Sequence, residues 1–360
     1  MKGTVMAKSE SAAAFGETYE TEKLIGLDLI RASEAAALNV YKWIGKGDKL
    51  AADYDATDAI RGMLNLVDMC GTCRIGEGIK DEAPGIFVGE KLGTWKPDSP
   101  CVSIAVDPID GTTLTSKGLP GALSVLAAAK MKTPDEHALE AVPSYYMETI
   151  AVGPKVKEGT GTIRFDVPVE QNLEVIALKL GKRLRDLCVC LLDRPRHEEL
   201  IQRIRKTGAA IRLIGDGDVA GAIAPSMPDS AVDVYMGIGG SPEAVLAAAA
   251  IKCLGGAMVC RIWPRDEEER KSLADEGYDE AALRKIYCCE DLARGEGIVF
   301  AATGITDSAM LKGLKVRGNI AVTHSVVMRA RSRTVRYITA YHDLTRKTIR
   351  LHSGKAHRLL

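Results

Sequence analysis

Residues 104–118 read IAVDPIDGTTLTSKG. The apolar run before Asp107 predicts a buried strand, and this strand ends in two aspartates, Asp107 and Asp110, separated by a proline and an isoleucine. Two carboxylates this close repel each other unless a positive charge lies between them. The stretch therefore predicts a layered fold with a cation-binding turn at the end of a buried strand.

Helices and strands alternate on both sides of this stretch. Residues 22–45 carry apolar residues at helical spacing, and residues 241–256, SPEAVLAAAAIKCLGG, begin with Ser-Pro and end in glycine, which is typical of a buried helix. The charged residues 265–287 predict a solvent-exposed helical stretch, and residues 319–344 alternate like a hairpin. This order indicates an α/β (α+β) layered sandwich with alternating helix and sheet layers.

Composition narrows the class of protein. The chain has 360 residues, with 48 Lys and Arg against 48 Asp and Glu, so its formal net charge is zero. It carries no basic surplus for nucleic acid and no general attraction to anionic membranes. No apolar run reaches the roughly 20 residues that a bilayer-spanning helix needs. We therefore expect neither a nucleic-acid nor a membrane partner.

The cysteines and the N-terminus bear on the compartment. Nine scattered cysteines, an odd number, argue against a disulfide scaffold and for a reducing compartment. Cys70 and Cys73 form a C-x-x-C, which is a weak signal; ordinary thiols are favoured over a redox switch that would strain a nearby metal site. The first twenty residues lack the apolar region of a secretory signal. We expect a cytoplasmic protein, with a plastid location as the alternative if these residues are a trimmed transit peptide.

Several acidic residues share one local context. They lie at ends of predicted helices or strands, and all but the first of them adjoin glycine or proline: Asp53, Glu77, Asp107, Asp110 and Glu243. A single acid in a turn is usually a cap, but acids at strand ends in an α/β layout converge where ligands bind. Oxygen clusters of this kind hold Mg²⁺ or Mn²⁺. The residues therefore predict a site for one divalent cation or two.

Other segments suit a phosphate ester. Thr112 and Thr113 follow the aspartates with hydroxyl and N–H groups, and the segment GGSPEAV offers a helix N-terminus. Arg194 and Arg196 suit bidentate phosphate contacts. Two further aspartates in a glycine-rich turn suit hydrogen bonds from sugar hydroxyls, namely Asp216 and Asp218. Each signal is weak alone, so the prediction depends on the set.

The motif DPIDGT, preceded by a strand and an upstream G-E-G, resembles the lithium-sensitive, magnesium-dependent phosphatase superfamily. The further motifs YKWIGKGDKLAAD, PRH, GDGDVAGAI, GIGGSPE, AAIKCLGG and FAATGITD are similar to those of class II (GlpX-type) fructose-1,6-bisphosphatases, in unbroken order over residues 23–346. GGSPEAV stands where other branches of the superfamily carry W-D-x-A. The resemblance implies the sugar-phosphatase fold.

The resemblance also implies residue roles. The metal ligands fall on Asp53, Glu77, Asp107, Asp110 and Glu243, and Thr112, Asp53 and Glu77 take catalytic roles. Substrate contacts fall on Asp110, Gly111, Thr112, Tyr146, Arg194, Pro195, Arg196, Asp216, Gly217, Asp218 and Gly240. Two positions depart from bacterial members, in which arginine often stands in place of Thr113 and lysine in place of Arg194.

The implied activity is metal-dependent hydrolysis of the 1-phosphate of fructose 1,6-bisphosphate in gluconeogenesis, with Mn²⁺ or Mg²⁺ as cofactor. The alternatives are a sedoheptulose-1,7-bisphosphatase or an enzyme that takes both sugars, an inositol-phosphatase-like enzyme, and a non-catalytic sensor. A homodimer or homotetramer is expected from the resemblance. The expected division is a flexible tail (1–21), a metal-binding subdomain (22–170), a substrate-binding subdomain that also supplies Glu243 (171–346) and a C-terminal tail (347–360).

Overall fold

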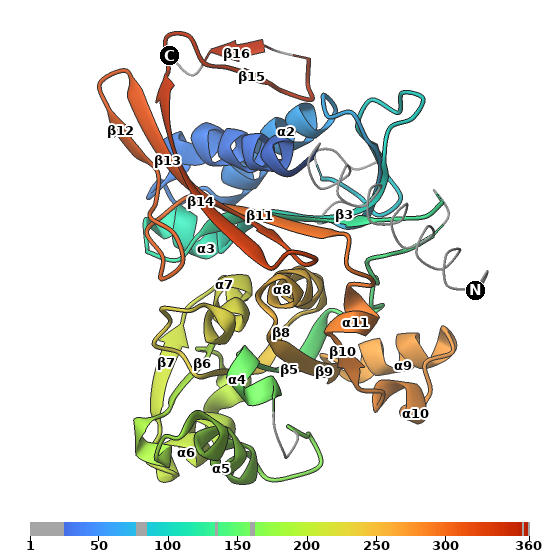
Figure 1. Ribbon diagram of the computed structural model, residues 1–360, viewed down its shortest axis with the longest axis vertical. Coiled ribbons are helices and arrows are strands. Elements are labelled where there is room, and N and C mark those ends of the chain that lie inside the picture. The colour runs from blue at the N-terminus through green and yellow to red at the C-terminus, as the bar shows by residue number, and fades with distance from the viewer. Residues whose placement is uncertain (1–24, 77–84, 134–135, 159–162, 355, 359–360) are drawn as a thin grey trace, which may run out of the picture.

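The computed structural model describes residues 25–76, 85–133, 136–158, 163–354 and 356–358. Helices and sheets alternate in five layers from top to bottom of Figure 1: helices, an eight-stranded sheet, helices, a six-stranded sheet, and helices. Three buried apolar clusters fill the spaces between these layers. The predicted α/β layered sandwich is confirmed.

The eight-stranded sheet takes strands from both ends of the described chain. It has the order β12-β13-β11-β4-β3-β1-β2, with β14 paired to β13. Only β1 and β3 pair in parallel. The strands are β1 (Cys70–Ile75), β2 (Lys91–Leu92), β3 (Cys101–Asp110), β4 (Leu123–Lys130), β11 (Ile298–Gly304), β12 (Lys315–Arg317), β13 (Ile320–Arg329) and β14 (Thr334–Asp343). β3, β4 and β11 are buried almost throughout because helices cover both faces of the sheet.

The six-stranded sheet has the order β10-β9-β5-β8-β6-β7. Its strands β6, β7 and β8 run in parallel, and β5 pairs antiparallel with β8 and β9. The strands are β5 (Tyr146–Val152), β6 (Cys188–Leu192), β7 (Ala210–Ile214), β8 (Val234–Gly240), β9 (Ala257–Ile262) and β10 (Tyr287–Cys288). The predicted boundary at residue 170 groups the chain differently from the sheets, since β5 lies in this sheet and β11 to β14 return to the other.

The middle layer consists of α7 (Asp218–Ile223) and α8 (Ser241–Leu254), which pack between the two sheets. α8 is apolar on all sides, so burial between two sheets is the arrangement that covers it. Its alanines are fully buried and small, and they let both sheets approach closely. The helix ends at Gly255, which adopts a left-handed conformation, as the sequence predicts.

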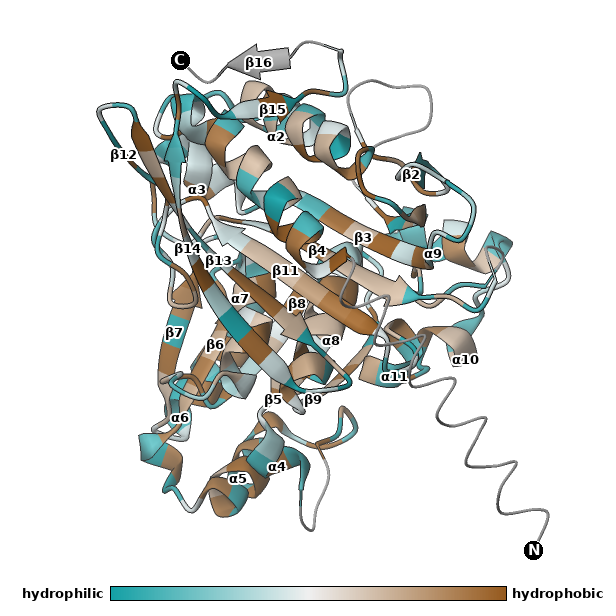
Figure 2. Cartoon of the chain, turned by 45° about the horizontal axis from the view of Figure 1, so that its top comes forward, coloured by the Kyte–Doolittle hydropathy of each residue, from teal (hydrophilic) through white to brown (hydrophobic). Residues whose placement is uncertain are grey.

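Helices also cover the two outer faces. The outer face of the eight-stranded sheet is covered by a helix over residues 25–40, by the turn η1 (Tyr41–Trp43) and by α2 (Lys49–Leu64). The outer face of the six-stranded sheet is covered by α5 (Val169–Leu180) and α6 (Glu198–Lys206). The remaining short elements are α3 (Thr112–Lys117), α4 (Pro154–Lys157), α11 (Cys289–Leu292), η2 (Leu184–Asp186), η3 (Pro195–His197) and η4 (Ala224–Ser226). Figure 2 shows hydrophobic residues concentrated along β3, β8 and β11, inside the stack.

The last strands, β15 (Thr348–Arg350) and β16 (Ala356–Arg358), form a hairpin against α2. The Asp58 carboxylate of α2 accepts hydrogen bonds from the Ser353 N–H at 2.8 Å and from its hydroxyl at 2.9 Å. Residues 348–353, within the segment expected to be a tail, are therefore held to the outer helix layer. The predicted N-terminal tail, residues 1–21, lies outside the described residues.

The charged segment 265–287 forms α9 (Glu267–Asp275) and α10 (Glu280–Leu283) at one edge of the molecule. The prediction of a wholly solvent-exposed face is wrong at four positions, because the structure buries Glu269, Leu273, Leu283 and Tyr287. No helix within the described residues is both long and apolar enough to cross a bilayer.

Candidate active site

A pocket of about 230 Å³ lies where β3 of the eight-stranded sheet meets the ends of β6 and β8. One wall comes from the end of β3 and the start of α3, and the opposite wall comes from the six-stranded sheet and the N-termini of α7 and α8. Its lining residues are Asp107, Ile109, Asp110, Gly111, Thr112, Tyr146, Leu192, Arg194, Arg196, Asp216, Gly217, Asp218, Gly240 and Glu243. The structure thus brings together most of the site residues that the sequence predicts.

The register of β3 explains how two aspartates three residues apart both line the pocket. Asp107 pairs with Val125 of β4, but Asp110 pairs with Leu123, so β3 contains one more residue than its partner at this point. In a regular strand, residues three apart point to opposite faces. The bulge reverses that alternation and turns both carboxylates toward the same cavity. Asp107 also accepts a hydrogen bond from the Ile109 N–H at 2.9 Å.

Asp110 lies in a strongly acidic, buried environment. Its side chain is 2% exposed, and within the described residues its Oδ2 atom has no hydrogen-bond partner. Burial, and then the negative charges of Asp218, Glu243 and Asp216, raise the pKa of Asp110 well above its ordinary value. Such crowding is offset when a cation binds, so this donor set fits a hard divalent metal ion.

The carboxylates share a pocket without forming a finished coordination shell. Among the residues that the structure describes, no three carboxylate, imidazole or thiolate groups already converge as a metal site. The predicted ligand Glu77 lies outside the described residues. Asp107, Asp110 and Glu243 line the pocket, whereas Asp53 on α2 does not line it and contacts the lining residue Thr112.

Asp53 meets the pocket through Thr112. The Thr112 hydroxyl lies 3.1 Å from Asp53 Oδ1 and 3.2 Å from the Ile109 carbonyl oxygen, and it donates its one proton to either acceptor. Burial raises the pKa of Asp53 to about 6. Gly111, with a φ of 97°, supplies the left-handed turn that starts α3 and presents Thr112 to the cavity.

The N–H and the hydroxyl of Thr113 both form hydrogen bonds with other residues of the protein. Its N–H donates to Asp216 Oδ2 at 3.1 Å, and its hydroxyl accepts a hydrogen bond from Lys49 Nζ at 2.8 Å. Thr113 is also absent from the pocket lining. The expectation that Thr113 contacts a phosphate directly therefore differs from the structure. Its backbone instead ties the start of α3 to the Asp216 turn.

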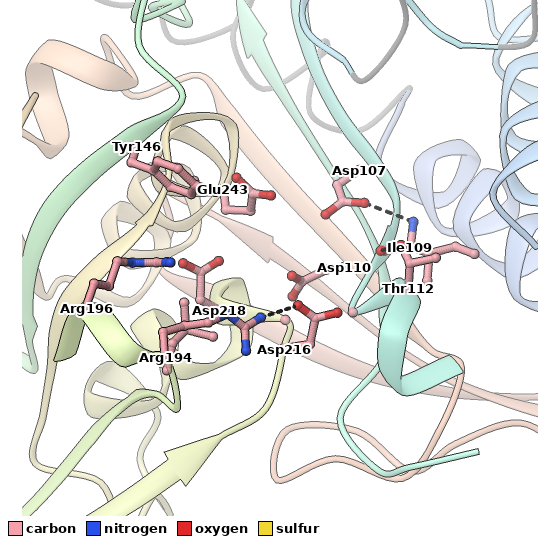
Figure 3. A pocket seen from close by; sticks show the side chains of 14 residues that line it. Asp107, Ile109, Asp110, Thr112, Tyr146, Arg194, Arg196, Asp216, Asp218 and Glu243 are labelled. Carbon is pink, nitrogen blue, oxygen red and sulfur yellow. Dashed lines mark hydrogen bonds and ion pairs between the residues drawn. The ribbon is translucent and has the colours of Figure 1, made fainter. Parts of the chain in front are cut away.

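The two arginines play different structural parts (Figure 3). Arg194 donates to Asp216 Oδ1 at 3.0 Å and to the Gly215 carbonyl oxygen at 2.5 Å, which joins the loops after β6 and β7. Arg196 lies over the Tyr146 ring, with its Cζ atom 4.8 Å from the ring centroid, and donates to the Ile238 carbonyl oxygen at 2.8 Å. Pro195 starts η3 between them but does not line the pocket.

The Asp218 carboxylate accepts a hydrogen bond from a buried tyrosine. The Tyr235 hydroxyl donates to Asp218 Oδ2 at 3.2 Å, and burial raises the pKa of Asp218 to about 6. Tyr235 is not among the predicted site residues, because a tyrosine in an apolar strand is usually a packing residue. It also missed Ile109, Leu192 and Lys49, and no local pattern distinguishes the first two from ordinary core residues.

The start of α8 brings Glu243 close to the backbone of β8. Gly240 has an ordinary extended conformation, with φ −66° and ψ 144°, but a Cβ atom there would lie 1.8 Å from Glu243 Oε2. A side chain at this position would therefore displace the Glu243 carboxylate, although the backbone conformation itself suits other residues. Glu243 lies in the first turn of the helix, where a negative charge is favourable.

The predicted C-x-x-C pair is separated by the geometry of β1. Cys70 and Cys73 are three residues apart on a strand and point to opposite faces. The Cys73 thiol is buried and donates to the Ile75 carbonyl oxygen, and burial raises its pKa to about 12. All nine cysteines are free in the structure. The geometry therefore gives no support to a Cys70–Cys73 switch.

A cavity between two sheets, lined by buried carboxylates from both sides and by two arginines, is the arrangement of an enzyme that handles phosphate esters with bound cations. The family model described as bacterial fructose-1,6-bisphosphatase, glpX-encoded, matches residues 23–342. The chain is 46% identical over 332 residues to fructose-1,6-bisphosphatase class 2 of Haemophilus influenzae, covering 89% of this chain and 97% of that protein. It is 42% identical over 333 residues to fructose-1,6-bisphosphatase 1 class 2 of Escherichia coli K12, covering 90% and 96%.

The chain belongs to the glpX-encoded fructose-1,6-bisphosphatase family. The predicted family is confirmed, and so is the predicted class of enzyme, a hydrolase of phosphoric monoesters. The family depends on a metal, in agreement with the acidic pocket.

Proposed function

We propose that this protein hydrolyses the 1-phosphate of fructose 1,6-bisphosphate, yielding fructose 6-phosphate and phosphate. The observation that carries the proposal is the pocket itself, in which the carboxylates of Asp107, Asp110 and Glu243 gather with the stacked Arg196 and Tyr146. Relatives that are 42–46% identical along nearly their whole length bear the name fructose-1,6-bisphosphatase.

Asp107, Asp110 and Glu243 would hold the divalent metal, together with Asp53 and Glu77. The bound metal would supply Lewis-acid stabilisation of the phosphoryl charge and activate a water. Asp110 Oδ2 has no hydrogen-bond donor among the residues that the structure describes, and this supports the assignment, because a buried carboxylate oxygen without a donor is costly unless a ligand completes it. We infer Mn²⁺ or Mg²⁺, since the donors are all oxygen.

The wall on the side of the six-stranded sheet would hold the sugar bisphosphate. Arg196 carries a positive charge at the pocket and is oriented by the Tyr146 ring and the Ile238 carbonyl. Asp218, oriented by Tyr235, would accept hydrogen bonds from sugar hydroxyls. Gly111, Gly217 and Gly240 expose backbone at the cavity, while Arg194 and Asp216 would act on the substrate as a hydrogen-bonded pair.

Thr112 and Asp53 would manage the proton. The Thr112 hydroxyl donates to Asp53, which leaves its oxygen lone pairs available to accept a proton from an attacking water in the pocket. Asp53 would then receive the proton that Thr112 releases. This relay needs both groups within hydrogen-bond reach, as they are at 3.1 Å.

The test is phosphate release with Mn²⁺ or Mg²⁺ from fructose 1,6-bisphosphate, sedoheptulose 1,7-bisphosphate and inositol 1-phosphate. We expect the first to be preferred and a chelator to abolish the activity. Preference for sedoheptulose 1,7-bisphosphate would replace the proposed substrate while keeping the mechanism. No release from any of the three would contradict the function.

We also infer a cytoplasmic homo-oligomer, either a dimer or a tetramer. The free state of all nine cysteines supports a reducing compartment. The oligomer is supported only by the family resemblance. Sedimentation equilibrium would test it, and a monomer at micromolar concentration would contradict it.

A further inference from the structure

One buried carboxylate fastens the charged helix α9 to the rest of the molecule. Glu269 is 7% exposed, whereas its neighbours Glu267 and Glu268 are exposed to solvent. The Asp266 side chain caps the same helix by accepting from the Glu269 N–H at 2.8 Å. A buried glutamate needs partners for both of its oxygens, and those of Glu269 explain where α9 is attached.

The two oxygens of Glu269 bind different segments. Oε2 accepts from the Arg265 N–H at 2.7 Å, which is a contact within the start of α9. Oε1 accepts from the Tyr145 N–H at 2.8 Å and lies 3.1 Å from the Ser144 hydroxyl, which donates its one proton either to Oε1 or to the Tyr146 carbonyl oxygen at 3.0 Å. These two bonds cross to the segment that leads into β5. They are hydrogen bonds to a charged acceptor, which are stronger than neutral ones.

The segment that Glu269 holds is also attached to the active site. The Ser144 carbonyl oxygen accepts from the Ser241 hydroxyl, and the Tyr145 carbonyl oxygen accepts from the Ser241 N–H at 3.0 Å. Ser241 is the first residue of α8, and Glu243 follows in the same turn. The next residue, Tyr146, pairs with Gly240 in the sheet and lines the pocket.

We propose that Glu269 is a positioning residue of this enzyme. It does not line the active-site pocket. It holds the Tyr145 N–H and contacts the Ser144 hydroxyl, and the backbone of these two residues sets the places of Tyr146 and of the first turn of α8. Glu269 therefore controls substrate binding and metal binding together, because both depend on the segment that leads into β5. The inference rests on the proposed roles of Tyr146 in substrate binding and of Glu243 in metal binding.

The experiment compares Glu269→Ala and Glu269→Gln with Glu268→Gln, the exposed neighbour on the same helix. Each variant is assayed for kcat, for the KM of fructose 1,6-bisphosphate and for the Mn²⁺ concentration that gives half activity. Mn²⁺ affinity is also measured by calorimetry without substrate. For Glu269→Ala we expect KM to rise and Mn²⁺ affinity to fall, each by about tenfold, as for the loss of supporting contacts around a metal site.

Glu269→Gln should cause a smaller change. Its amide oxygen can still accept from Tyr145 and Ser144, but its NH₂ group meets the Arg265 N–H, a donor facing a donor. Glu268→Gln should match the wild type in every measurement.

A purely structural role makes a different prediction. It lowers the fraction of active enzyme, and hence the apparent kcat, but leaves the KM and Mn²⁺ affinity of the folded molecules unchanged. Folded Glu269 variants with wild-type values of both would overturn the proposal, and Glu269→Gln alone decides the question if the alanine variant does not fold. A wild-type protein that binds no Mn²⁺ would instead overturn the proposed metal site, on which the inference about Glu269 rests.

Discussion

At the scale of single residues, the pocket contains buried carboxylates whose negative charge the protein alone does not balance. Asp110 and Asp218 are both buried, and each has a raised pKa because burial disfavours the charged form. Asp218 has Tyr235 as a donor, but within the described residues Asp110 Oδ2 has none. Such a group is unfavourable for folding and is retained because binding needs it.

Asp110→Asn tests this charge. We expect activity to fall more than about 100-fold, since an amide is a poor replacement for a carboxylate metal ligand. The metal-free variant should melt at the wild-type temperature or above it, because a neutral side chain avoids repulsion from Asp216, Asp218 and Glu243. The increase in melting temperature on adding Mn²⁺ should vanish. Phosphate release and thermal unfolding measure both effects.

The control for Asp110→Asn is Asp275→Asn, at an exposed position at the end of α9. It should match the wild type in both measurements. An Asp110→Asn enzyme with full activity would remove Asp110 from the metal site.

At the scale of secondary-structure elements, a close contact between β8 and α8 places Glu243. Gly240→Ala should push the Glu243 carboxylate out of place, since the new Cβ would lie 1.8 Å from Oε2. We expect activity to fall more than about tenfold. Stability should change by less than about 1 kcal/mol, because the displaced atoms end a flexible side chain and the backbone conformation suits alanine.

Gly26→Ala is the matched control for this substitution. Its nearest side-chain atoms lie at 3.7 and 3.8 Å from the new Cβ, which is ordinary contact. Activity and unfolding curves of both variants decide the result. Full activity in Gly240→Ala would mean that Glu243 does not need its present position.

A second element-scale feature joins the helix over residues 25–40 to the hairpin β13–β14. The Thr323 hydroxyl donates to Glu34 Oε1 at 3.0 Å and therefore accepts from His342 Nε2–H at 2.8 Å. Burial lowers the pKa of His342 to about 4 and raises the pKa of Glu34. The structure thus holds the imidazole neutral.

This network predicts a pH dependence of stability. Between pH 6.5 and about 4 the unfolded chain protonates His342 while the folded chain does not, so folding stability falls as the pH falls through this window. Glu34 acts in the opposite sense, since its raised pKa favours folding at lower pH. Comparison with His342→Gln isolates the imidazole.

Melting temperatures at pH 5, 6, 7 and 8 test the prediction. The wild type should lose stability relative to His342→Gln as the pH falls below about 6.5, and the difference should be constant above pH 7. Parallel curves over the whole range would show that His342 is not held neutral.

At the scale of the whole molecule, the candidate active site joins two layers. Asp107 and Asp110 lie on β3 of the eight-stranded sheet, whereas the arginines lie just after β6 of the six-stranded sheet. A ligand that touches both walls binds only the assembled fold, so it stabilises the native state by mass action.

We therefore expect Mn²⁺ and fructose 6-phosphate each to raise the melting temperature. At 100 times its dissociation constant a ligand contributes about 2.7 kcal/mol. Arg196→Ala should keep the Mn²⁺ effect and lose most of the sugar-phosphate effect, because Arg196 lies on the substrate wall. Differential scanning fluorimetry measures both. An unchanged sugar-phosphate effect in Arg196→Ala would place the sugar elsewhere.

The sequence by itself determined the order of elements, the buried character of α8 and the acidic residues beside glycine and proline. These depend on local chemistry, namely backbone preferences, hydrophobic periodicity and turn residues, which neighbouring positions express directly. The motifs around Asp107, Asp110, Arg196 and Glu243 were therefore sufficient to indicate the family before any contact was known.

Only the tertiary structure decided which of these residues act together and how. The bulge in β3 that turns Asp107 and Asp110 the same way is a register relation with β4. The supports from Tyr235 and Glu269 are contacts between different elements, and that of Glu269 joins segments far apart in the chain. Such contacts follow from the way that helix and sheet layers pack, and the local spacing of residues does not contain them. For the same reason Glu269 looked like one more surface charge until its partners were seen.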